Sequence, residues 1–147
     1  MYLKSYSFLD VIASFGGPTG AFNLNNGIEE GGIKITMRGE KNIMTVGADG
    51  KVMHSLRADN SAEVSIRLLK TSPTNALLNT MYNLQRIDST LWGQNVITLN
   101  HAIGDEVVAT QVAFKKQPDV VYSEAGGMNE WLFDCGVSNE LLMGTLV

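Results

Sequence analysis

Two histidines and one cysteine are the residues of this chain best able to do chemistry on their own. His54 and His101 lie far apart, and neither belongs to a metal-binding spacing such as HExxH. Histidines inside strand-like segments are more often structural or surface residues than metal ligands. Cys135 has no second cysteine for a disulfide and no basic neighbour to lower its pKa. We therefore expect no metal site, no Cys-based zinc site and no cysteine nucleophile.

Two glycine-rich segments could be mistaken for phosphate-binding loops. The segment GADGK at 47–51 lacks the four-residue spacer and the Ser or Thr that follow the pattern of a P-loop. It also joins two strand-like segments, whereas a P-loop joins a strand to a helix. The segment GGPTG at 16–20 is likewise not followed by a helix. We interpret both segments as turns and expect no nucleotide or other cofactor.

Carboxylates and aromatic side chains give no stronger indication of catalysis or of nucleic-acid binding. Asp10, the pair Glu29-Glu30 and the pair Asp105-Glu106 are candidates for catalytic carboxylates, but they are scattered, and carboxylates beside turns are usually solvated. Aromatic residues make up only 7% and are not interleaved with Lys and Arg, as a stacking platform for single strands requires. The net charge of −4 disfavours a general nucleic-acid binder. The sequence predicts a protein that is not an enzyme.

Length and composition describe a single folded domain. The chain has 147 residues and a mass of 16.0 kDa, with 44% hydrophobic and 18% charged residues, which excludes a disordered chain. The N-terminal decapeptide has no apolar run of the kind found in signal peptides, and turn motifs interrupt the uncharged stretch 11–28. We expect a soluble protein of a reducing compartment with one domain over residues 1–147.

Alternation of apolar and polar residues predicts short strands through most of the chain. Between residues 62 and 68, every even position is apolar and every odd position is polar, which is typical of a strand with one face in water. Asp49-Gly50 between two such segments is a strong hairpin signal. The predicted strands are 6–15, 21–24, 33–38, 42–46, 51–57, 62–68, 95–99, 106–114 and 128–134. Short strands at this spacing predict an antiparallel β-barrel or β-sandwich.

One segment, residues 73–87, is predicted to be a helix. Ser72 is a suitable N-cap, and Pro73 suits the first helical position. The apolar stripe expected to face the sheet consists of Leu77, Leu78, Met81, Tyr82 and Leu84. The side chains expected to face water are Asn75, Asn79 and Asn83. The predicted fold is therefore mainly β with one flanking helix.

Seven segments in their joint order resemble one protein family. They are YSFLDV at 6–11, NIMTVGADG at 42–50, MHSL at 53–56, RLLKTSPTNALL at 67–78, LWGQNVI at 91–97, VAFKK at 112–116 and GGMNEW at 126–131. Together they resemble the tail tube proteins of bacteriophages with contractile tails. The resemblance extends over the chain, although the segment after Cys135 matches least well.

The resemblance implies a β-barrel-like subunit with a flanking helix that forms six-membered rings. Stacked rings would form the inner tube of the tail within a sheath, and phage DNA would pass through the tube during injection without specific binding. The implied partners are further copies of the chain and the sheath, tape-measure, baseplate and tail-terminator proteins. The implied location is the virion, after assembly in the bacterial cytoplasm. The resemblance brings no catalytic residues, cofactor or membrane contact.

The residues themselves suggest where such a subunit would make contacts. Unpaired edge strands can be covered by neighbouring copies around a ring. Two turns contain the residues that we expect to make contacts between stacked rings: Gly17, Pro18, Ala48, Asp49, Gly50 and Lys51. The polar set Glu63, Ser65 and Arg67 would line either the channel or the outer surface. The acidic balance of the chain suggests a neutral to negative channel, because a basic lining would bind phosphate.

Three other readings of the sequence remain open. A tail terminator, or the tube protein of a related injection system, would share the fold; a terminator caps a tube without polymerising. A monomeric small-ligand-binding β-barrel would show the same alternation but would need an enclosed apolar pocket. A hydrolase on a β scaffold is the remotest of these readings.

Overall fold

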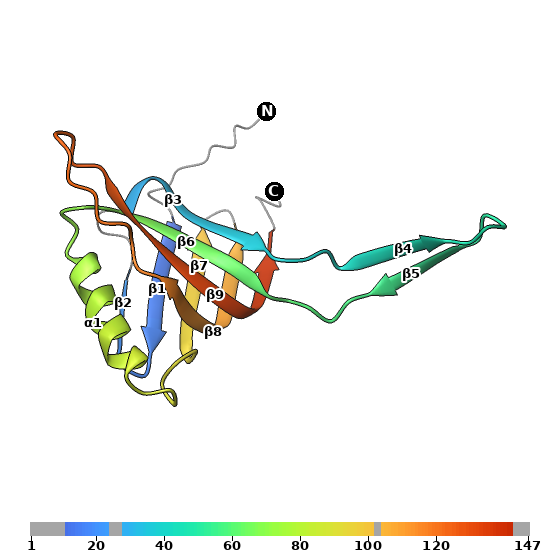
Figure 1. Cartoon of the computed structure of the whole chain (residues 1–147), viewed down its shortest axis with the longest axis horizontal. Coiled ribbons are helices and arrows are strands. Elements are labelled where there is room, and N and C mark those ends of the chain that lie inside the picture. Colours follow the sequence, from blue (N-terminus) through green and yellow to red (C-terminus); the bar gives the residue numbers. More distant parts are fainter. Residues whose placement is uncertain (1–10, 24–27, 102–103, 143–147) are drawn as a thin grey trace.

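The computed structural model describes residues 11–23, 28–101 and 104–142. Within these residues, seven strands form one antiparallel sheet in the order β2-β1-β7-β8-β9-β6-β3, and β4 and β5 form a separate two-stranded sheet (Figure 1). The strands are β1 (Val11–Gly17), β2 (Gly20–Asn23), β3 (Ile28–Met37), β4 (Asn42–Val46), β5 (Val52–Leu56), β6 (Ala62–Leu69), β7 (Asn95–His101), β8 (Glu106–Lys116) and β9 (Met128–Leu141). The single helix of this part of the chain is α1 (Thr74–Arg86).

The seven-stranded sheet curls around one core, which makes the fold sandwich-like. Phe15 of β1 lies 5.3 Å from Phe133 of β9, measured between ring centroids, although β7 and β8 separate these strands in the sheet. Phe114 of β8 contacts both rings, with centroids 5.9 Å and 5.1 Å away. Aromatic pairs at these separations add favourable ring–ring contacts to the burial of apolar area. The prediction of a mainly β fold with one helix is confirmed.

The predicted alternation decides which side chains enter this core. In β6, Ala62, Val64, Ile66 and Leu68 are fully buried, while Glu63, Ser65 and Arg67 are half-buried on the other face. In β9, Trp131 and Phe133 are buried as predicted, and Glu130 and Asp134 lie on the opposite face. A strand with one face against a core and one face toward solvent is what a period of two produces.

Several strands extend beyond their predicted limits. β9 continues to Leu141, where the prediction ended at residue 134, because β8 supplies ladder partners as far as the pair Glu106 and Leu141. β3 begins at Ile28 and pairs with β6 through a register shift between Ile28 and Ile33. β1 ends at Gly17, and the part of its predicted strand before residue 11 lies outside the described residues. The length of a strand depends on how far its partner strand extends, and the hydropathy pattern of the strand itself does not show this.

Helix α1 packs on the core with a stripe that differs from the predicted one. Leu78 and Met81 are buried as expected, and so are Thr74 and Gln85, whereas Leu77 and Leu84 are 48% and 45% exposed. The N-cap is Pro73 instead of Ser72, although Ser72 Oγ accepts a bond from the backbone N–H of Thr74 at 3.3 Å. No helix among the described residues is long and apolar enough to cross a membrane.

A buried pair of amides fixes the C-terminal half of α1 to the sheet. Gln85 Nε2 donates to Asn95 Oδ1, and Asn95 Nδ2 donates to Gln85 Oε1, both at 2.8 Å. Asn95 Nδ2 also donates to the carbonyl of Val112 at 3.0 Å, and Gln85 Nε2 donates to Thr19 Oγ1 at 3.0 Å. Both amides are fully buried, and buried polar groups need such partners to offset their desolvation. The pair therefore explains how Gln85 can lie in the buried stripe of the helix.

Candidate functional site

The most unusual feature of the molecule is the hairpin β4–β5, which projects from the body (Figure 1). The chain leaves the sheet from β3, forms the hairpin and returns into β6, so the hairpin continues two paired strands of the body. Its turn is closed by Gly47 N–H donating to the carbonyl of Lys51 at 2.7 Å and by Gly50 at φ +85°. The predicted hairpin and the limits of the strand 42–46 are confirmed.

The hairpin is apolar and exposed at the same time. On one face, cross-strand pairing brings together Val46 with Val52 and places Met44 beside His54. The exposed fractions are 57% for Met44, 56% for Val46, 52% for Val52 and 88% for Leu56, which shares this face. We call these four residues the apolar hairpin face. An isolated two-stranded hairpin is marginally stable in water, and contiguous exposed apolar side chains mark interaction surfaces.

Hydrogen bonds join the two chain segments at the base of the hairpin and order the turn that leads into β6. Arg57 N–H donates to the carbonyl of Lys41 at 2.8 Å, and Lys41 Nζ donates to the carbonyl of Arg57 at 3.1 Å. Asp59 Oδ1 accepts from the hydroxyl of Ser61 at 2.6 Å and from its N–H at 2.9 Å. These bonds to Ser61 hold the pKa of Asp59 below its ordinary value. The hairpin thus leaves the body through a hydrogen-bonded junction.

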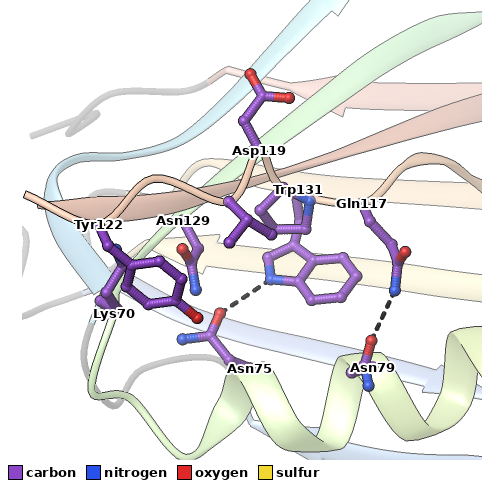
Figure 2. A pocket seen from close by; sticks show the side chains of 10 residues that line it. Lys70, Asn75, Asn79, Gln117, Asp119, Tyr122, Asn129 and Trp131 are labelled. Carbon is purple, nitrogen blue, oxygen red and sulfur yellow. Dashed lines mark hydrogen bonds between the residues drawn. The ribbon is translucent and has the colours of Figure 1, made fainter.

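A groove lies between α1 and the segment 117–122 that follows β8 (Figure 2). Its volume is about 330 Å³. Trp131 lies between the two walls, and its Nε1 donates to Asn75 Oδ1 at 3.0 Å. Gln117 Nε2 donates to Asn79 Oδ1 at 2.7 Å, which links the segment to the helix. The prediction that Asn75 faces water is wrong, because this amide is half-buried against Trp131.

The rim of the groove combines exposed apolar side chains with two charges. Val120 is 78% exposed and Tyr122 is 86% exposed. Lys70 Nζ donates to the carbonyl of Val121 and lies 4.6 Å from the centroid of the Tyr122 ring. Asp119 forms an ion pair with Lys116 at 3.3 Å but keeps 78% of its side chain exposed. The groove can therefore accept polar backbone, apolar side chains and a charge of either sign.

The outer face of β3, β6, β8 and β9, together with Arg38 directly after β3, carries charges that pair between neighbouring segments. The three pairs are Arg38–Asp134 at 3.3 Å, Glu63–Lys115 at 2.9 Å and Arg67–Glu130 at 3.7 Å. The predicted polar set Glu63, Ser65 and Arg67 lies in the middle of this face. Because each carboxylate faces a cation, these six charges cancel locally.

The residues that could do chemistry on their own are not brought together. His54 lies on the hairpin beside Asn42, with 3.1 Å between His54 Nδ1 and Asn42 Nδ2, and His101 lies at the end of β7. Cys135 is only 2% exposed, and burial raises the pKa of its thiol. In the described parts of the chain, no group of three or more His, Cys, Asp or Glu side chains could hold a metal ion.

The predicted contact residues lie in two different settings. Ala48, Asp49, Gly50 and Lys51 form the exposed tip of the hairpin. Gly17 packs directly against Asn95 in a tight turn between β1 and β2, while Pro18 at that turn is exposed. The groove was not predicted, because its walls come from segments far apart in the sequence.

Comparisons with known proteins agree on one kind of protein. A model of the bacteriophage PhiTE tail tube protein family matches residues 3–143. No curated protein matches the chain in sequence.

The fold is similar to solved structures from contractile injection systems. The sheath/tube terminator of the extracellular contractile injection system PVC, in its extended state, aligns with a TM-score of 0.62 at 11% identity, covering 97% of this chain and 100% of the other. The tube-terminating cap of the anti-feeding prophage aligns at 0.58 and 9% identity, covering 96% and 93%. A chain of the PVC sheath–tube complex aligns at 0.56 and 12% identity, covering 93% and 91%.

Proposed function

We propose, from the premise that this chain belongs to the bacteriophage PhiTE tail tube protein family, that it forms six-membered rings which stack into the inner tube of a contractile tail. The tube would conduct phage DNA during injection and would contact the sheath, tape-measure, baseplate and terminator proteins. This function needs surfaces for self-assembly and no reactive pocket. The subunit would be made in the host cytoplasm and would end in the virion.

The observation that carries this proposal is the exposed apolar hairpin on a body that already has a complete core. Fully burying one Val, Leu or Met side chain stabilises by about 1.5–3 kcal/mol relative to leaving it exposed. The apolar hairpin face offers four such side chains to a partner. The predicted contacts at Ala48, Asp49, Gly50 and Lys51 lie at its tip and would reach a neighbouring ring. Pro18, beside Gly17, is the second candidate contact between rings.

The edges of the large sheet supply a means of closing each ring. The sheet order places β2 at one edge and β3 at the other, so the two edges differ in sequence and length. Pairing of β3 with β2 of the next copy is a head-to-tail contact, which closes into a ring when the rotation per subunit divides the circle. Such pairing also covers the edges, which otherwise tend to pair indiscriminately.

The charge pattern suits a channel for a polyanion. Proteins bind nucleic acids mainly by releasing counterions from phosphates with Lys and Arg. On the face of β3, β6, β8 and β9, Arg38, Arg67 and Lys115 are each paired with a carboxylate. A channel lined by this face would offer few uncompensated cations to passing DNA. Lys34 of β3 lies opposite Ser65 on the same face, is exposed and pairs with no carboxylate among the described residues, so the pattern supports a nearly neutral lumen and not a negative one.

Electron microscopy of the purified protein tests the proposal. We expect rings that stack into hollow tubes of uniform diameter at high protein concentration, whereas dispersed monomers would overturn the proposal. Deleting Ala48–Gly50 should leave folded, soluble subunits that do not polymerise, since the inter-ring contact is lost. The matched control is Ile87→Ser, which removes a side chain that is 78% exposed on the body and should leave tubes intact. Normal tubes from the deletion variant would show that the hairpin tip is not part of the contact between rings.

A tail terminator is the second candidate function, and the fold similarity to the PVC sheath/tube terminator favours it. A terminator would bind the end of a preformed tube and would not polymerise alone. Microscopy of the isolated protein therefore distinguishes rings that stack from rings that do not. The aromatic rings that fill the core argue against the ligand-binding barrel, which would need that space for its ligand.

A further inference from the structure

We propose that the groove between α1 and residues 117–122 receives the hairpin tip of a second copy of this chain. The inference rests on the proposed function, and it names the surface that the tip contacts. The occupant is the turn 47–51 with the adjacent residues Val46 and Val52. The receiving surface is defined by the walls of the groove described above.

The first support is the position of the two features. Figure 1 shows the hairpin leaving one end of the body and α1, with the segment that joins β8 to β9, at the other end. A projection at one end and a recess at the opposite end cannot satisfy each other within one subunit. They can do so between copies in a head-to-tail arrangement, and repetition of that contact produces an extended assembly.

The second support is chemical complementarity. The bond between Gln117 and Asn79 uses the amide nitrogen of Gln117 and the amide oxygen of Asn79. Gln117 Oε1 therefore remains as an acceptor, and Asn79 Nδ2 remains as a donor. The peptide groups of Ala48 and Asp49 at the turn are not part of the ladder between β4 and β5. A side-chain amide offers the same kinds of donor and acceptor as a peptide group. The groove can therefore form hydrogen bonds with the peptide groups of the turn when these lose their contacts with water.

Charges and apolar side chains are also matched. The tip carries Asp49 and Lys51, whose side chains are 60% and 89% exposed. The rim of the groove carries one cation, Lys70, and one carboxylate, Asp119. Docking would exchange the contact between Asp49 and Lys51 within the tip, and the ion pair of Asp119 with Lys116, for ion pairs between copies. Val46 and Val52 flank the tip as Val120 and Tyr122 flank the groove.

The third support is size. A volume of about 330 Å³ lies at the lower end of the range of about 300–1,000 Å³ typical of ligand pockets. This volume is enough for the end of the turn only, so Val46 and Val52 would lie at the rim of the groove and the rest of the ribbon outside it. The remaining apolar hairpin face would then lie across the surface beside the groove.

Cysteine pairing in assembled tubes tests the inference. The variant Ala48→Cys/Asn79→Cys should form disulfide-linked dimers and longer chains on mild oxidation of tubes, since these positions would meet between copies. The matched control, Ala48→Cys/Ser65→Cys, places the second cysteine on the charged face and should give no linked species above the background of Ala48→Cys alone. Equal linking in both variants would overturn the inference.

A second measurement covers the case in which the double variant fails to assemble. A benzophenone-maleimide probe on Ala48→Cys, photolysed in tubes, should label peptides of α1 and residues 117–129, which mass spectrometry identifies. Labels elsewhere on the chain, or on a sheath protein in intact tails, would overturn the inference while leaving the tube function intact. Failure of the wild-type protein to form tubes would instead contradict the proposed function.

Charge reversal gives an independent check. Asp119→Lys should reduce the yield of tubes, and Lys51→Glu in the same chain should restore it, because the ion pair then forms with reversed signs. Loss of tubes that Lys51→Glu does not restore would count against the groove as the receiving surface.

Discussion

Strand β3 of the body leads into β4 of the hairpin, and β5 of the hairpin leads back into β6 of the body. Most apolar side chains of β6 are buried, whereas those of the hairpin are exposed. Val64 in β6 is fully buried, whereas Val52 in β5 is 52% exposed. Both segments are apolar and both are paired antiparallel. What differs is the second layer: α1 and the far side of the curled sheet cover the body strands, and nothing within the described chain covers the hairpin. Apolar content therefore does not report burial unless a covering layer is known.

Thiol reactivity should show the largest difference between the body and the hairpin. Cys135 should react with a thiol reagent on the order of 10³-fold or more slowly than a cysteine placed by Thr45→Cys, because it needs an opening of the body. Burial also raises the pKa of the Cys135 thiol, so less reactive thiolate is present at a given pH. The rate at which a disulfide reagent releases its coloured product measures the reactivity of each thiol. Similar rates at the two sites would show that the body opens as readily as the hairpin.

The same pKa shift predicts a direction for stability. The folded state holds the thiol proton to higher pH than the unfolded state does, since the pKa of Cys135 is raised in the fold. Stability should therefore fall as the pH rises through the ordinary thiol range. Urea unfolding of the wild type and of Cys135→Ala at neutral and alkaline pH isolates this contribution, and an identical pH dependence in both would contradict it.

Truncation of a core side chain should come next in size. Phe133→Ala should lower the free energy of unfolding by about 3–5 kcal/mol, because Phe133 is fully buried against Phe15 and Phe114. Val52→Ala in the hairpin should change it by no more than about 0.5 kcal/mol. Urea denaturation followed by tryptophan fluorescence measures both values. A large effect at Val52 in dilute monomer would mean that the hairpin is packed in the subunit itself.

Substitution of two glycines compares the tolerance of the backbone in the body with that in the hairpin. Gly17→Ala should cost about 1–3 kcal/mol, because the new Cβ would overlap Asn95 Oδ1, and that amide is held by hydrogen bonds. Gly50→Ala meets open space and should cost about 1 kcal/mol, because only its φ of +85° is unfavourable for alanine. Thermal unfolding ranks the two. Hydrogen exchange should place the effect of Gly50→Ala in the hairpin alone, and faster exchange across the sheet would contradict this.

The smallest expected effect concerns ion pairs. Glu63→Gln should lower the free energy of unfolding by no more than about 1 kcal/mol, since the Glu63–Lys115 pair is partly exposed to water. Lys51→Gln at the hairpin tip should have no measurable effect in the monomer, because its 3.8 Å contact with Asp49 is largely exposed to water. Repeating the unfolding in high salt should reduce the difference between these variants, and a difference that persists would indicate a role other than charge.

Local signals were enough to predict the hairpin and the central strands. The strand 42–46 has its predicted limits, and the strand predicted at 62–68 is observed as Ala62–Leu69, because clear alternation and a turn motif specify both locally. The helix was predicted within one residue at each end, but its buried stripe was not. Gln85 is buried because Asn95, ten residues away, completes its hydrogen bonds. No pattern within the helix reports such a partner.

The two halves of the candidate site differ in the same way. The tip of the hairpin is continuous in sequence, so a turn motif identified it. The groove combines Lys70, Asn79, Gln117 and Trp131 from separate elements, and only the fold brings them together. The end of β9 was missed for a related reason, since its ladder partner in β8 is specified by topology.

The continuity of the hairpin with β3 and β6 has a mechanical consequence. A pulling force on the tip would enter the large sheet along the direction of its strands. Ladder hydrogen bonds run perpendicular to the strands, so β6 and β9, which are paired from Ala62–Cys135 to Leu69–Met128, would share the load in shear across the whole ladder. Bonds loaded together resist far more force than bonds that open one after another. A filament joined through such a hairpin would be stiff under tension along its length.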